Sequence, residues 1–140
     1  MAQKIRDVMT ANPTALAATT SIADAARAMR EKDIGDVIVL DDDNRVCGMV
    51  TDRDIVVRAV ADDRQPSEVR LGDICSRDLA AVGPDEAVED AVRTMRENAL
   101  RRLPVIDNGR PVGIVTLGDL AIERDPESAL AGISAAPPNT

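Results

Sequence analysis

Apolar residues recur with the spacing of an amphipathic helix at two places in the chain. Both sets follow the order i, i+3, i+4 and i+7: Ile22, Ala25, Ala26 and Met29 in one, Val88, Ala91, Val92 and Met95 in the other. This spacing places the apolar side chains on one face of a helix. We therefore expect a helix in each segment, with Ser21 and Asp85 as N-cap residues.

Short apolar runs follow each predicted helix and indicate strands. In each half of the chain two runs flank a polar cluster, which is typical of a hairpin turn. The four runs cover residues 37–40, 46–50, 103–106 and 112–115. We expect a further helix to begin at Thr51 and at Thr116, and a third strand in each half at residues 15–17 and 79–82.

The two sets of elements form an internal repeat. Residues 21–41 align with residues 87–107, and after a one-residue deletion in the polar turn VCGMVTDRDI aligns with PVGIVTLGDL. Each half therefore reads as βαββα. A half of about 60 residues buries too little apolar surface to fold alone, so we predict an α/β fold, of the α+β type, in which two tandem repeats pack about a pseudo-twofold axis.

The repeat also predicts how the chain is divided. We expect the first repeat at residues 1–62, a linker at 63–70 and the second repeat at 71–123. The linker segment holds Pro66 and lacks apolar periodicity. The remaining residues, 124–140, are rich in Ala and Pro and predict a tail with one short helix at 126–133.

The composition limits the chemistry that this chain can perform. Its 140 residues include no His, Trp, Tyr or Phe, and 44% are hydrophobic, so the core must be aliphatic. Without His the chain lacks the usual general base and the commonest metal ligand, and Ser/His/Asp catalysis is excluded. We therefore expect no enzymatic activity and no metal site.

Charge and hydropathy narrow the set of partners. The net charge of −8 repels a nucleic-acid backbone. No apolar run approaches the ~20 residues needed to span a bilayer, and the first residues, MAQKIRDVMT, do not read as a secretory signal. The expectation is a cytoplasmic protein with neither a nucleic acid nor a membrane as partner.

Two cysteines and an aspartate run are further candidates for a reactive thiol or a metal site. Cys47 and Cys75 align with Val112 and Met9 of the other repeat, so we interpret them as reduced thiols that pack as small hydrophobes. The run Asp41–Asp43 lacks the ligand spacing of a calcium loop and is interpreted as a solvated hairpin turn.

The chain contains the same motif in both halves. The pattern Gly-x-x-Thr-x-x-Asp occurs twice, as Gly48, Thr51 and Asp54 and as Gly113, Thr116 and Asp119, and the second half also holds the segment RRLPVID. Together with the strand-turn-strand that precedes each motif, these features resemble the paired CBS domains over about residues 4–123.

The resemblance implies a regulatory module with no required cofactor. CBS pairs commonly take adenosine nucleotides such as AMP, ADP or ATP, and sometimes S-adenosylmethionine, in clefts between the repeats, and they usually form homodimers. In the family the motif Asp holds the ribose hydroxyls, while the Thr and the helix N-terminus approach the phosphate. These roles fall on Asp54 with Thr51 and on Asp119 with Thr116.

The chemistry of the motif is consistent with two roles. A carboxylate can accept both hydrogens of a ribose cis-diol, and a Thr beside free backbone N–H groups favours an anion. The same Thr and Asp also fit a capping box that only stabilises the helix start. With no aromatic ring available, adenine would lie between aliphatic side chains, near Leu16, Val37, Val39, Val82 and Leu103.

Arginines distinguish the two halves. Basic residues just before the Pro-containing strand often contact phosphate in nucleotide-binding members, which makes Arg101 and Arg102 candidates, whereas the first half has Gly35 and Asp36 there. Arg53 is placed to reach an anion at the first helix start. Solvated charges or ordinary salt bridges are the alternative for all three arginines.

Two functions remain open at this stage. The first is a stand-alone nucleotide sensor, for example of cellular energy state, that changes shape or dimer packing and signals to an unidentified effector protein. The second is a ligand-free structural or stress-related interaction protein that keeps the CBS pair for dimerisation. The first half lacks the two arginines before its strand, which favours the ligand-free interaction protein. The intact motif in both halves favours the nucleotide sensor.

Overall fold

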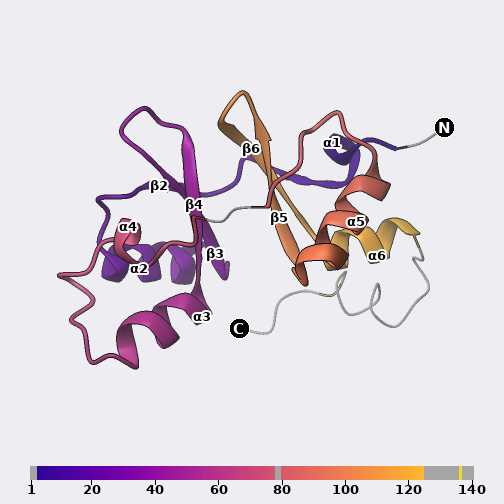
Figure 1. The fold of residues 1–140 in the computed structure, drawn as a ribbon. Coiled ribbons are helices and arrows are strands. Elements are labelled where there is room, and N and C mark those ends of the chain that lie inside the picture. Colours follow the sequence, from indigo (N-terminus) through magenta and orange to yellow (C-terminus); the bar gives the residue numbers. More distant parts are fainter. Residues whose placement is uncertain (1–2, 78–79, 125–135, 137–140) are drawn as a thin grey trace. The chain divides into compact units, whose positions relative to one another are not determined.

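The computed structural model describes residues 3–77, 80–124 and 136, which form two compact units (Figure 1). One is continuous in sequence, Thr14–Leu79, and is called the contiguous unit. The other joins Met1–Pro13 to Ala80–Thr140 and is called the composite unit. The expected short helix at 126–133 lies outside the described residues. No helix in the described part of the chain has the length and apolar character needed to cross a membrane.

The contiguous unit is a three-stranded sheet with helices packed against it. The sheet has the order β2-β3-β4, with β2 parallel and β4 antiparallel to β3. Its elements are β2 (Ala15–Ala17), α2 (Ile22–Lys32), β3 (Asp36–Leu40), β4 (Val46–Thr51), α3 (Asp52–Ile55), the π-helix η1 (Val56–Val60) and α4 (Leu71–Ile74). Its core is aliphatic, as the composition requires: Ile22, Ala25, Val37, Val39, Val50, Ala59 and Leu71 are all fully buried.

The composite unit has the same layers but an antiparallel sheet of order β1-β6-β5. Its elements are α1 (Ile5–Val8), β1 (Thr10–Ala11), α5 (Val88–Asn98), β5 (Arg102–Asp107), β6 (Arg110–Thr116) and α6 (Leu117–Arg124). Ile5 from the N-terminal segment is fully buried among Leu103, Val105 and Val115.

Most predicted elements are confirmed, with two corrections. Ser21 caps α2, since its Oγ accepts the Asp24 N–H at 3.1 Å. Asp85 does not cap α5, because that helix begins after Ala87, and the Asp85 carboxylate instead pairs with the Arg6 guanidinium at 2.6 Å. Of the strand expected at residues 79–82, the described residues 80–82 form one parallel bridge, Val82 with Val105 in β5, and β1 provides the third strand at the opposite edge of the sheet, beside β6.

The compact units divide the chain differently from the repeats at 1–62 and 71–123. The Ile5 N–H donates to the Glu86 carbonyl at 2.9 Å, which ties the first residues to the second repeat. Ser76 in turn pairs with Met49, which ties the start of the second repeat to the first. The segment 63–70 is also more than a spacer, because Val69 is buried in the contiguous core and its carbonyl accepts the Ile22 N–H.

Both motif glycines lie where another backbone segment passes close to the sheet. A Cβ on Gly48 would stand 2.5 Å from the Ser76 carbonyl oxygen and 3.0 Å from the Cys75 Sγ. A Cβ on Gly113 would stand 2.9 Å from the Thr10 carbonyl oxygen and 2.5 Å from the Met9 Sδ. Close packing at these two positions therefore requires glycine.

Candidate functional site

The first motif forms a reciprocal capping box at the start of α3. The Thr51 Oγ1 accepts the Asp54 N–H at 3.1 Å, and the Asp54 Oδ2 accepts the Thr51 N–H at 2.9 Å. The Asp54 side chain is 19% exposed, and its Oδ1 lies 3.7 Å from the Arg58 Nε. The capping role weighed for this motif is therefore observed.

The second motif repeats this arrangement at the start of α6. The Thr116 Oγ1 accepts the Asp119 N–H at 3.1 Å, and the Asp119 Oδ2 accepts the Thr116 N–H at 2.9 Å. In both motifs capping uses one carboxylate oxygen, Oδ2, and the second oxygen, Oδ1, takes no part in it. A carboxylate of this kind can cap the helix and still accept a hydrogen bond from a ligand.

The residues before β3 and β5 lie directly beside these helix starts. The Gly35 carbonyl accepts the Asp52 N–H at 2.9 Å, and the Arg101 carbonyl accepts the Leu117 N–H at 2.8 Å. Arg102 is the sheet partner of Thr116. The backbone of Arg101 and Arg102 thus lies beside the capping box of Thr116 and Asp119, and the phosphate contact that the family resemblance implies for the two arginines stays a prediction.

Arg53 is fully on the surface of the first helix start. Its backbone N–H donates to the Asp52 Oδ1 at 2.8 Å, and its side chain is exposed. Among the residues that the structure describes, its guanidinium forms no salt bridge with Asp52 or any other acid. A role for Arg53 toward an anion stays a prediction.

The aliphatic residues predicted to lie beside adenine are mostly core residues. Val37, Val39 and Leu103 are fully buried, Val82 is 4% exposed, and only Leu16 in β2 keeps partly exposed surface. Because four of these side chains pack inside their own unit, a bound ring would meet them only through the backbone of their strands. Their contact with adenine stays a prediction.

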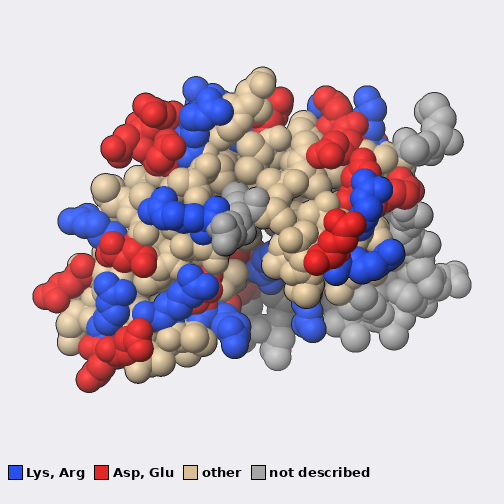
Figure 2. Space-filling model, in the orientation of Figure 1, with Lys and Arg blue, Asp and Glu red and all other residues tan. Residues whose placement is uncertain are grey.

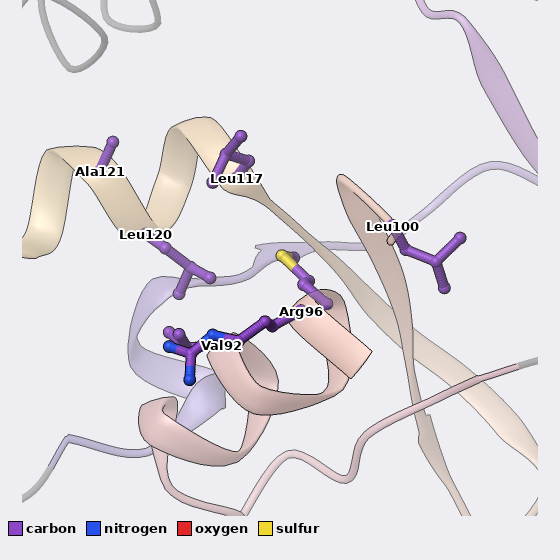
Figure 3. A pocket seen from close by; sticks show the side chains of 7 residues that line it. Val92, Arg96, Leu100, Leu117, Leu120 and Ala121 are labelled. Atoms are coloured by element: carbon purple, nitrogen blue, oxygen red, sulfur yellow. The ribbon is translucent and has the colours of Figure 1, made fainter. Parts of the chain in front are cut away.

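Two cavities with opposite chemistry lie outside the motifs. An apolar groove of about 380 Å³ lies between α5 and α6. Val92 and Arg96 line it from α5, and Leu120 lines it from α6 (Figure 3). A polar cavity of about 410 Å³ in the contiguous unit is lined by Arg58, Cys75, Ser76 and Arg77. Neither cavity is evident from the sequence pattern. The one available signal was Arg58, which stands one helical turn after Asp54.

The cysteines and the aspartate run behave as structural groups. Cys75 is buried in the contiguous core, and Cys47 packs against that core with its surface half-buried. Burial, reinforced by Cys75, raises the pKa of the Cys47 thiol above that of an ordinary cysteine. The Asp41 carboxylate accepts the Asp43 and Arg45 N–H groups, as expected of a hairpin turn. Within residues 3–77 and 80–124, no cluster of three Cys, Asp or Glu side chains is placed to bind a metal ion.

The comparisons with known proteins agree with the repeat. The family model of the CBS domain matches residues 5–60 and 71–124. Hypoxic response protein 1 of Mycobacterium tuberculosis is 37% identical over 116 residues, which cover 83% of this chain and 81% of that protein. YhcV of Bacillus subtilis, a CBS domain-containing protein, is 34% identical over 134 residues, covering 93% and 94% of the two chains. The uncharacterized protein MK0525 of Methanopyrus kandleri is 38% identical over 116 residues, and the match spans only 57% of its length.

Solved structures show the same fold. The crystal structure of Hypoxic Response Protein I, which holds two coordinated zinc ions, has a TM-score of 0.78 at 36% identity and covers 85% of this chain and 97% of that one. The CBS domain pair of MJ0100, crystallised with 5-methylthioadenosine and S-adenosyl-L-methionine, has a TM-score of 0.80 at 23% identity, covering 91% and 100%. The α/β fold of two tandem CBS repeats is therefore confirmed.

Proposed function

The chain belongs to the CBS-domain family, and from this membership and the geometry of its helix starts we propose that it is a regulatory module for an adenosine-containing nucleotide such as AMP, ADP or ATP. The observation that carries the proposal is the pair of motif aspartates. Each one caps its helix with Oδ2 and keeps Oδ1 outside the capping box. An ionised carboxylate in this position accepts hydrogen bonds from ribose hydroxyls without giving up its structural role.

The composite unit offers the stronger of the two candidate sites. Asp119 and Thr116 stand at the start of α6, a helix of eight residues whose dipole favours an anion near its N-terminus. Arg101 and Arg102 flank this helix start through the Leu117 hydrogen bond and the pairing with Thr116. Two cations beside a carboxylate match a nucleotide, which presents ribose hydroxyls and a phosphate close together. The MJ0100 pair, similar in fold, was crystallised with two adenosine-containing molecules.

Replacing Asp119 with asparagine tests this proposal. Asparagine still accepts the Thr116 N–H but removes the charge that strengthens bonds to ribose, so AMP affinity should fall about tenfold or more with little change in melting temperature. Equilibrium dialysis read near the adenine absorbance maximum measures the affinity, because the chain has no aromatic residue that absorbs there. Adenosine in a parallel arm tests the ribose contact without the phosphate.

Asp73 provides the matched control. Its carboxylate caps α4 by accepting the Arg70 N–H at 3.0 Å, in a capping box outside the repeated motif. Asp73→Asn should leave AMP affinity unchanged. The nucleotide proposal is wrong if Asp119→Asn lowers the melting temperature and leaves AMP affinity intact. It is also wrong if the wild-type chain binds none of AMP, ADP, ATP and S-adenosylmethionine.

We further propose that the module forms a homodimer and passes its signal to an effector protein. Exposed apolar side chains lie close to the motif in each unit: Val56 at 57% and Val60 at 56% on η1, after Asp54, and Leu117 at 41% on α6, between Thr116 and Asp119. Such surface is typical of an interface. Sedimentation should give twice the chain mass of 14.9 kDa, and Val56→Asp with Val60→Asp should give one chain mass. A monomeric wild type would contradict the dimer.

A ligand-free interaction protein is the second candidate function. Two observations favour it. Both capping boxes are complete without a ligand, and four of the five aliphatic residues expected beside adenine are packed in the cores. A module of this kind would dimerise and bind partners through the same exposed apolar surface. The dialysis experiment separates the two functions, because only the sensor binds a nucleotide.

A further inference from the structure

Two guanidinium groups line the polar cavity of the contiguous unit, and both donate to carbonyl oxygens of one short helix, α4. Arg58 approaches from η1, where its Nη1 donates to the Ile74 carbonyl at 2.9 Å. Arg77 approaches from the chain after α4, where its Nη2 donates to the Gly72 carbonyl at 3.2 Å. Both acceptors belong to α4, so this helix holds the two cations at the same cavity of about 410 Å³.

These contacts leave most of the hydrogen-bonding capacity of the two arginines unused. A guanidinium has five N–H donors. Besides the carbonyl bonds, Arg58 has one carboxylate neighbour, the Asp54 Oδ1 at 3.7 Å from its Nε. Two positive charges thus face one negative charge, and among the described residues no acid lines the cavity. The local excess is positive, although acidic and basic residues are interspersed over the face drawn in Figure 2.

Ser76 adds a neutral hydrogen-bonding residue to the lining of this cavity. Its backbone is fixed against β4, since its N–H donates to the Met49 carbonyl at 3.2 Å. Its side chain lines the same cavity. Planar guanidinium forks together with a hydroxyl match the oxygen atoms of a tetrahedral oxyanion, which accepts several hydrogen bonds at once.

The other repeat lacks this group. By sequence alignment Arg58, Ser76 and Arg77 correspond to Glu123, Thr10 and Ala11. The second repeat instead has Arg101 and Arg102 before its strand, where the first has Gly35 and Asp36. The two units therefore place their arginine pairs differently, Arg58 with Arg77 in the contiguous unit and Arg101 with Arg102 in the composite unit, and the first pair was not evident from the motif.

We infer that Arg58, Ser76 and Arg77 form a binding site for a phosphate group in the contiguous unit. The phosphate belongs either to a nucleotide held at Asp54, one helical turn from Arg58, or to a free phosphate ion. The site stands on the cavity and its cations, so it does not require that a nucleotide binds at Asp119.

Titration calorimetry of the full chain with pyrophosphate, at constant ionic strength, tests the site. Wild-type protein should bind pyrophosphate, and Arg58→Gln and Arg77→Gln should each weaken binding about tenfold or more. Arg64→Gln, at an exposed position of the same unit that does not line the cavity, is the matched control and should leave binding unchanged. No binding by wild type, or equal losses in all three variants, overturns the inference.

Two further arms separate the phosphate sources and guard against misfolding. If a nucleotide supplies the phosphate, AMP displaces pyrophosphate and loses affinity in the two arginine variants, whereas adenosine does not displace it. If the ligand is free phosphate, AMP leaves pyrophosphate bound. Should Arg58→Gln fail to fold, Arg77→Lys and Ser76→Ala carry the test: both should weaken pyrophosphate, and unchanged affinity in both overturns the site. Failure of AMP binding at Asp119 with pyrophosphate bound at Arg58 rejects the proposed function alone.

Discussion

Replacing Gly48 with alanine is expected to lower the free energy of unfolding by about 3 kcal/mol. The added Cβ would stand 2.5 Å from the Ser76 carbonyl oxygen. That oxygen belongs to backbone fixed by the Ser76 N–H bond to Met49, so it cannot move aside without breaking the pairing with β4. The substitution therefore destabilises the backbone pairing of the sheet, and the movement of one flexible side chain cannot relieve the clash.

Thermal unfolding followed by circular dichroism measures this effect, which should appear as a loss of about 10 °C in melting temperature. Gly83→Ala is the control, because its Cβ would meet nothing closer than the Glu86 Oε2 at 3.4 Å. Gly113→Ala should fall between the two, because its closest neighbour, the Met9 Sδ at 2.5 Å, belongs to a flexible side chain and the nearest backbone atom, the Thr10 carbonyl oxygen, lies at 2.9 Å. Equal melting temperatures for Gly48→Ala and Gly83→Ala would refute the close-packing explanation.

Deleting residues 1–13 should unfold the composite unit. The contiguous unit keeps every buried residue of its own core and should stay folded, in contrast to the expectation from length that a half cannot fold alone. The deletion removes fully buried Ile5 from the core and strips β1 from the edge of β6. It also removes the carbonyl of Gln3, which accepts the N–H of Val88 at the start of α5. Loss of a core side chain alone costs about 2–5 kcal/mol, and the lost strand adds to this.

Hydrogen exchange with mass spectrometry resolves the two units in one experiment. Peptides from β5, β6 and α5 should lose protection, and peptides from β3 and β4 should keep it. The point variant Ile5→Ala, which keeps β1, should reduce protection less than the deletion. If β5 and β6 remain protected without residues 1–13, the N-terminal segment is not part of that unit's core.

The sequence predicted the repeated elements because each has a clear local signal. Periodic apolar residues marked α2 and α5, and paired apolar runs marked the hairpins of β3 with β4 and β5 with β6. The assignment of segments to units had no such signal. Nothing local in residues 1–13 shows that Ile5 packs against Leu103 and Val105, since that contact joins residues far apart in sequence.

From the sequence the motif has two predicted roles, helix capping and ligand binding, and the structure shows the capping bonds. Thr51 with Asp54 and Thr116 with Asp119 have a fixed spacing, so their mutual hydrogen bonds follow from sequence. The polar cavity could not be predicted in this way. Arg58 and Arg77 line one cavity because each donates to a carbonyl oxygen of α4, and the bond of Arg58 to Ile74 joins separate elements in a way that residue spacing does not encode.

Because residues 1–13 pack with the composite unit, the two units complete their cores at different times during synthesis. The contiguous unit, Thr14–Leu79, can complete its core once that stretch has left the ribosome. The first thirteen residues emerge earlier but find their partners, β5, β6 and α5, only after residues 88–116 have been synthesised. Ile5 and Val8 are therefore without their packing partners during this interval, when chaperones and proteases can reach these apolar side chains.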